Sequence, residues 1–217
     1  MDIGYTPRTR LKTNVYIDGF NLYYGAVRGT PFKWLDVAKL CSLLLPAHDI
    51  HRIRYFTARV SATPANPDAP RNQHAYLRAL GTVPNLSIHF GHFLTQRKWM
   101  PLVSPAPNGP ALAEVWKREE KGSDVTLASH LLHDGHRNDY AVAVVVSNDS
   151  DLVEPIRLVR EDLQKVVGVL NPHALPAKQL MKHAVFLKQI RAGPLGASQF
   201  PLTLEDARGT IVKPSTW

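Results

Sequence analysis

Ala141-Val-Ala-Val-Val-Val-Ser-Asn-Asp-Ser-Asp151 is the stretch that decides the fold of this chain, because an unbroken apolar run passes directly into two carboxylates. A fully apolar run such as 141–146 is typical of a central parallel strand that is covered on both faces. The carboxyl ends of parallel strands lie along one edge of a sheet, and ligands bind in the crevice there. Asp149 and Asp151 are therefore candidate catalytic residues.

Two further segments carry an aspartate where a strand or turn passes into a helix. Val15-Tyr-Ile-Asp-Gly-Phe-Asn21 places Asp18 after a short apolar strand, and Lys121-Gly-Ser-Asp-Val125 places Asp124 at the start of a helix. Right-handed crossovers bring such strand ends to one edge of the sheet. Aspartate is also a common helix N-cap, so capping is the alternative role for these residues.

The chemistry expected of this acidic set is phosphate-ester hydrolysis with a metal ion. Carboxylates that converge repel each other and raise each other's pKa values, and a hard divalent cation relieves that repulsion. Oxygen ligands suit Mg²⁺ or Mn²⁺, which lower the pKa of a bound water and stabilise the leaving oxygen. The polar residues expected to assist at the same edge are Asn21, Ser147 and Lys121.

Strands and helices alternate along the chain, which predicts a three-layer α/β domain with a mainly parallel sheet of about five strands. The strands are expected near residues 14–18, 50–60, 86–93, 141–146 and 166–170. The helices are expected near residues 35–45, 71–80, 124–133, 152–162 and 176–190. Residues 94–119 contain four prolines and interrupt the alternation, so we expect an arm or β-hairpin that stands off the sheet. The domain is predicted to span 13–192, with terminal extensions at 1–12 and 193–217.

The charge of the chain favours a polyanionic partner. Lys and Arg number 26 against 18 Asp and Glu, giving a net charge of +8 and a pI near 9.7. Trp99 and Trp116 flank the proline-rich arm and offer stacking faces for unpaired bases, although packing on their own domain is the alternative. The arm also offers a surface for a homodimer. The basic residues expected to follow a phosphate backbone are Arg52, Arg54, Arg59, Arg71, Arg97, Lys98, Lys117 and Arg118.

Several protein classes are disfavoured by what the sequence does not contain. The single cysteine, Cys41, permits neither an internal disulfide nor a cysteine-based zinc cluster, and its apolar surroundings predict a buried, inert thiol. No signal peptide is visible and no apolar run approaches the ~20 residues of a membrane span, so we expect a cytoplasmic protein without a membrane partner. Dinucleotide-binding and Walker glycine motifs are also missing.

The three aspartate segments together resemble the NYN domain family of PIN-like ribonucleases. The matching stretches are Val15-Tyr-Ile-Asp-Gly-Phe-Asn-Leu-Tyr23, Lys121-Gly-Ser-Asp-Val-Thr-Leu-Ala128 and Val145-Val-Ser-Asn-Asp-Ser-Asp-Leu152, within a resemblance from about 13 to 190. It implies a Rossmann-like (PIN-like) domain that cuts RNA, expected to be single-stranded, with Mg²⁺ or Mn²⁺. The metal ligands that it implies are Asp18, Asp124 and Asp149, with Asp151 as a fourth acidic member.

The resemblance also has departures and competing interpretations. Similar sequences often carry glycine where this chain has Asn148, and the long arm is not explained by the family pattern. A non-catalytic RNA-binding or regulatory module on the same fold is one alternative to an endoribonuclease, although the presence of all four aspartates favours catalysis. A different enzyme, either a phosphohydrolase or a small-molecule oxidoreductase, is the other alternative.

Overall fold

A seven-stranded sheet organises residues 10–217, which are the residues that the computed structural model describes. The strand order is β4-β3-β2-β1-β5-β6-β7, and every neighbouring pair is parallel except β3 and β4. The strands are β1 (Leu11–Asp18), β2 (His48–Ala58), β3 (Leu86–Pro101), β4 (Leu112–Lys121), β5 (Val142–Val146), β6 (Val166–Asn171) and β7 (Phe186–Gln189).

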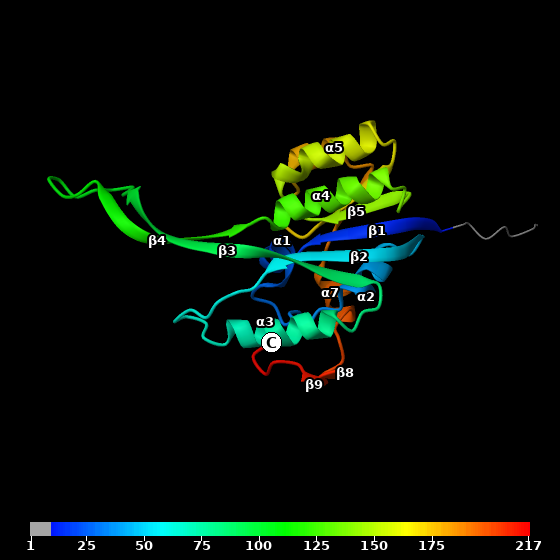
Figure 1. Ribbon diagram of the computed structural model, residues 1–217, viewed down its shortest axis with the longest axis horizontal. Coiled ribbons are helices and arrows are strands. Elements are labelled where there is room, and N and C mark those ends of the chain that lie inside the picture. The colour runs from blue at the N-terminus through cyan, green and yellow to red at the C-terminus, as the bar shows by residue number, and fades with distance from the viewer. Residues whose placement is uncertain (1–9) are drawn as a thin grey trace, which may run out of the picture.

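Helices cover both faces of this sheet. In Figure 1, α4 and α5 lie on one side, and α2, α3 and α7 lie on the other. The helices are α1 (Gly19–Leu22), the π-helix η1 (Tyr23–Val27), α2 (Val37–Leu44), α3 (Ala69–Leu80), α4 (Ser123–His136), the 3₁₀ turn η2 (Ser150–Leu152), α5 (Val153–Glu161), α6 (Lys178–His183) and α7 (Ala192–Ala197).

Two hydrophobic cores result from the period-two alternation of the central strands. Val15 and Ile17 pack with Trp34 in one core, whereas Tyr16, between them in sequence, packs with Leu127 in the other. All five residues of β5 are buried, as expected for a strand between two helical layers. The predicted α/β class with a mainly parallel sheet is therefore confirmed, as is burial of Cys41.

The expected strand number was wrong, because the described sheet has seven strands rather than about five. One extra strand is β4, which forms the second half of the arm. The other is β7, which lies where the sequence predicted a single helix over Pro176–Ile190. That helix ends at His183, and Phe186–Gln189 instead pairs with the exposed edge of β6. Phe186 packs directly against Gly168 of β6, where a side chain would leave no room for its ring.

The arm projects beyond the edge of the sheet where β1 ends (Figure 1). It is the expected hairpin at 94–119: β3 continues past its parallel pairing with β2, and residues 92–101 pair antiparallel with 112–121. No helix within residues 10–217 is long and apolar enough to cross a membrane.

The C-terminal extension belongs to the hydrophobic core. Phe200 and Ile211 are buried with α2 and α3, and the Trp217 ring contacts Trp34 and Tyr76. A small two-stranded sheet, β8 (Thr203–Asp206) with β9 (Gly209–Val212), lies against α3. Within this extension, Thr216 and Trp217 also line a pocket. Most of the extension predicted at 1–12 lies outside the described residues.

Candidate active site

The edge of the sheet at which β1 and β5 end carries Asp18 and Asp149, and we call it the acidic edge. It is located at the point where the strand order reverses. β1 lies between β2 and β5, and Ile17 of β1 pairs with Val146 at the end of β5. The next residues of the two strands, Asp18 and Ser147, therefore emerge side by side. In open α/β sheets this reversal leaves a crevice in which ligands bind.

A continuous hydrogen-bond network joins four of the predicted positions at this edge. The Ser147 hydroxyl donates to Asp18 Oδ2 at 3.2 Å, and the Asp149 amide donates to the same hydroxyl at 3.1 Å. The backbone N–H of Asn21 donates to Asp18 Oδ1 at 2.9 Å, while the side-chain Oδ1 of Asn21 accepts from the backbone N–H of Asn148 at 2.8 Å. The structure thus brings together Asp18, Asn21, Ser147 and Asp149, and it also shows the capping role of Asp18 on α1.

Asn148 fixes a neighbouring loop to this edge. Its side-chain amide donates to the Leu175 carbonyl at 3.0 Å and accepts from the Ala177 amide at 2.6 Å. Glycine at this position would remove both bonds. The departure from the family pattern therefore links the loop between β6 and α6 to the site.

Burial and neighbouring charge raise the pKa of Asp18 to about 6. The largest cause is desolvation, and the carboxylates of Asp149 and Glu120 raise the pKa further, whereas the hydrogen bonds from Asn21 and Ser147 lower it. Raised carboxyl pKa values cluster at functional sites. Asp18 therefore has the electrostatic character expected of a cation-binding or catalytic carboxyl.

This shift predicts a pH-dependent difference in stability between the wild type and Asp18→Asn in EDTA. The folded state binds the Asp18 proton more tightly than the unfolded chain does, so this carboxyl stabilises the fold below about pH 4. That stabilisation is lost as the pH rises through about 6. The variant should therefore become more stable relative to the wild type across this window, by at most about 3 kcal/mol. Urea denaturation at several pH values measures it. The exposed Asp49→Asn is the matched control, and an equal change in both variants would contradict the assignment.

Glu120 is a member of the site that sequence reasoning missed. It lies one residue from the end of β4, next to Gly91 of β3, and its carboxylate accepts bonds from Ser123 N and Oγ at 3.1 and 2.8 Å. The antiparallel register of the arm places this residue opposite Phe93 of β3, from where its charge acts on Asp18. The sequence signal was the acidic pair Glu119-Glu120, which by itself resembles a solvated strand end.

The other predicted residues occupy less central positions. Asp124 lies in the first turn of α4, where its carboxylate accepts from the Val125 amide, and the N-cap is Gly122. Asp151 is exposed, and its amide donates to Asp149 Oδ1 at 3.0 Å, so Asp149 is the residue that caps η2. Lys121 pairs with Glu119 at 3.3 Å, and the exposed Arg71 pairs with Asp68 at 3.2 Å.

Within residues 10–217, no three His, Cys, Asp or Glu side chains converge in an arrangement that can hold a metal ion. The carboxylates that act on Asp18 are Asp149 and Glu120. The four-aspartate ligand set therefore stays a prediction. Oxygen donors from Asp18 and Asp149, with the Asn21 amide and the Ser147 hydroxyl beside them, are of the chemical type that Mg²⁺ and Mn²⁺ prefer.

An aromatic pocket of about 790 Å³ opens next to the acidic edge. Its wall includes Gly19, the residue after Asp18, and it extends between α1, the end of β2, α3 and the C-terminal residues. The aromatic side chains that line it are Phe20, Tyr23, Tyr24, Tyr55, Tyr76, Phe93 and Trp217. The cationic side chains that line it are Arg28, Lys33 and Arg118. No local pattern predicts this pocket, because its residues come from five separate segments.

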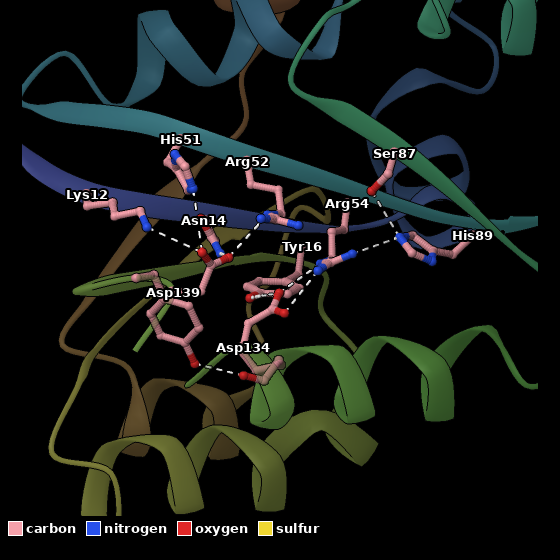
Figure 2. Close-up of polar contacts among 12 residues, drawn as sticks. Lys12, Asn14, Tyr16, His51, Arg52, Arg54, Ser87, His89, Asp134 and Asp139 are labelled. Atoms are coloured by element: carbon pink, nitrogen blue, oxygen red, sulfur yellow. Dashed lines mark hydrogen bonds and ion pairs between the residues drawn. The ribbon is translucent and has the colours of Figure 1, made fainter. Parts of the chain in front are cut away.

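Two arginines expected on a phosphate-binding surface instead pair with carboxylates of the domain, Arg54 in the interior and Arg52 at a partly exposed position (Figure 2). Arg54 is 9% exposed and binds Asp134 of α4 through two bonds, of 2.7 and 2.9 Å, and the Tyr16 hydroxyl donates to the same carboxylate at 2.8 Å. Arg52 Nε lies 3.2 Å from Asp139. The assignment of Arg54 to a phosphate-binding surface is therefore wrong, and the pair instead ties α4 to β1 and β2.

The fold and this edge define an α/β protein with an acidic switch point, the position at which open α/β sheets bind ligands. The NYN domain family matches residues 12–188, and the chain belongs to this family, which suggests a nuclease-like function.

The chain is also similar to two individual proteins. It is 32% identical, over 95% of its own length and 75% of the relative's, to 6-hydroxy-3-succinoylpyridine 3-monooxygenase HspA of Pseudomonas putida. A crystal structure of a protein of unknown function from Vibrio parahaemolyticus, VPA0982, has a TM-score of 0.55 at 16% identity, covering 87% of this chain and 98% of that one. The second likeness concerns the fold alone.

Proposed function

We propose that this protein is a metal-dependent endoribonuclease that hydrolyses phosphodiester bonds of single-stranded RNA at the edge where Asp18 and Asp149 meet. The observation that carries the proposal is the desolvated Asp18 carboxyl, on which the charges of Asp149 and Glu120 act, at the strand-order reversal of an NYN domain. Such repulsion costs folding free energy, which a bound cation offsets. RNA as substrate also agrees with the basic charge and the expected cytoplasmic location.

The residues present suit one hard divalent cation, Mg²⁺ or Mn²⁺, held by Asp18 and Asp149. Asp124 and Asp151 are proposed as further ligands or as groups that position water. When bound, the cation would neutralise the scissile phosphate and lower the pKa of a water molecule. Ser147 and Asn21 hold the Asp18 carboxylate in one orientation through the bonds described above. Lys121 and Arg71 are proposed to contact the phosphate backbone.

The test of this function is incubation of the protein with labelled single-stranded RNA and Mg²⁺ or Mn²⁺, beside samples that contain EDTA. Cleavage that EDTA abolishes is the expected result. RNA that is bound but stays intact with both Mg²⁺ and Mn²⁺ would refute the proposed nuclease activity and support a regulatory RNA-binding module.

A second candidate is an enzyme that acts on a small aromatic acid. Two observations favour it: the name of the Pseudomonas relative, and the pocket that combines aromatic walls with Arg28, Lys33 and Arg118. Tight binding of 6-hydroxy-3-succinoylpyridine, seen as a rise in melting temperature without any RNA cleavage, would establish this candidate and displace the first.

Binding of single-stranded RNA is expected to weaken linearly with salt on logarithmic axes. Each phosphate that a cationic side chain neutralises releases condensed counterions, with a slope of about −0.7 per contact for a single strand. Fluorescence anisotropy in EDTA at several salt concentrations measures the slope without cleavage. A flat response would contradict a phosphate-binding surface on this basic chain.

A further inference from the structure

One face of the arm is continuous with the acidic site. In a β-ribbon, side chains two residues apart along a strand, and residues directly opposite across it, share a face. Phe93 is opposite Glu120, Arg97 is opposite Trp116, and Trp99 is opposite Glu114. These residues, with Thr95 and Arg118, therefore share one face of the ribbon. That face starts at Glu120, whose charge acts on Asp18.

Aromatic rings and arginines alternate along this face. Phe20 of α1 packs edge-on against Phe93, with ring centroids 5.7 Å apart, and the Arg118 guanidinium lies 4.2 Å from the centroid of Phe93. Farther out, Arg97 lies 6.0 Å from the Trp116 centroid. Trp99 and Trp116 remain 66% and 72% exposed, so the described residues leave both rings open to a partner.

We propose that this face, from Phe93 to Trp99, is a track along which single-stranded RNA stacks its bases on its way to the acidic site. The proposal rests on the proposed function and specifies its substrate: an unpaired strand that reaches the site from the arm. The six steps from Phe93 to Trp99 extend about 20 Å at the rise of a strand, enough to guide several nucleotides. Aromatic platforms interleaved with arginine are the means by which proteins bind single strands without reading sequence.

Two observations favour RNA over a second copy of the chain as the occupant. The face runs without interruption from its tryptophans into the aromatic pocket and the carboxylates, because Phe93 and Arg118 line that pocket. The cations on this face are arginines, which stack on bases and pair with phosphates. Glu114 lies 3.6 Å from Arg97 Nε and offsets part of its charge, so stacking is expected to supply most of the affinity.

The test uses the whole 217-residue chain with the Asp149→Asn substitution and fluorescent oligouridine, in EDTA. Trp99→Ala and Trp116→Ala should each weaken binding of a strand long enough to span the arm by about tenfold, and should leave the salt slope unchanged. A dinucleotide bound at the acidic site is too short to extend to the tryptophans, so its binding there should be equal in all variants. The matched controls are Leu94→Ala and Met100→Ala, because both side chains are 42% exposed on the opposite face of the same ribbon.

Several outcomes would overturn the track. Unchanged binding in both tryptophan variants would do so, as would equal loss in the Leu94 and Met100 controls. Sedimentation showing a dimer that dissociates in the tryptophan variants, with RNA affinity unaltered, would assign the face to a second copy of the chain. Because binding is measured without cleavage, loss of the track is distinguishable from failure of the nuclease: a protein that never cleaves RNA can still show the tryptophan dependence.

Discussion

RNA cleavage by Asp149→Asn is expected to fall by at least about a hundredfold, on the scale seen when one electrostatic stabiliser of a transition state is removed. The fold should be preserved, because asparagine keeps the Oδ1 acceptor that caps η2 through the Asp151 amide. What the variant loses is the negative charge next to Asp18. Single-turnover cleavage of a labelled strand at saturating protein measures the chemical step apart from binding.

Two comparisons make that result specific. Asp49→Asn makes the same substitution at an exposed position near the start of β2, at the end of that strand away from the acidic edge. This variant should cleave RNA at the wild-type rate. The Asp149→Asn variant should still bind RNA at least as tightly as the wild type does in EDTA, since a charge that repels phosphate is gone. Wild-type cleavage by the variant would show that Asp149 takes no part in the reaction.

Asp134→Ala is expected to cause the largest loss of stability, about 3–5 kcal/mol in the free energy of unfolding. The substitution leaves the Arg54 guanidinium buried without its bidentate partner and removes the acceptor of the Tyr16 hydroxyl. His89, whose Nε2 is 3.3 Å from Arg54, supplies no negative charge in place of the lost carboxylate: its burial and the charges of His130 and Arg54 lower its pKa to about 4, so the ring is neutral. Urea denaturation of purified variants measures the loss.

The neighbouring carboxylate in Figure 2 provides a matched control. Asp139 faces Lys12, His51 and Arg52, all of which are more exposed than Arg54, and accepts one bond from the buried Asn14 side chain, so Asp139→Ala should cost only about 1–2 kcal/mol. The double variant Arg54→Met with Asp134→Leu replaces the ion pair by apolar groups and should recover much of the loss. Equal effects of Asp134→Ala and Asp139→Ala would show that burial of the Arg54 pair is unimportant.

The sequence predicted the parts of the fold that depend on local pattern. Apolar runs that are buried on both faces of the sheet, such as β5 and the Val15-Tyr-Ile17 part of β1, carry a signal that tertiary contacts do not override. The four prolines of residues 94–119 correctly predicted the arm. In contrast, the run Val185-Phe-Leu187 is too short to separate strand from helix, and only the free edge of β6 determines that β7 forms there.

Site residues were predictable from the sequence only where they lie at or just after the end of a strand. Asp18, Ser147 and Asp149 follow strands that are adjacent in the sheet, so topology alone brings them together. Glu120 and the aromatic pocket depend on the arm register and on the packing of the C-terminal residues, which no local pattern encodes. Arg54 was predicted wrongly for the same reason. A basic residue in an alternating strand is expected at the surface, and only the packing of α4 on the sheet reveals its buried partner, Asp134.

The measurement that tests RNA hydrolysis at this edge most directly is a Mn²⁺ titration of single-turnover cleavage with end-labelled single-stranded RNA, with wild type and Asp149→Asn purified in parallel. We predict cleavage by the wild type that rises with Mn²⁺ to a plateau, disappears in EDTA, and is reduced at least about a hundredfold in the variant. Intact RNA at every Mn²⁺ concentration, or equal cleavage by both proteins, would contradict it.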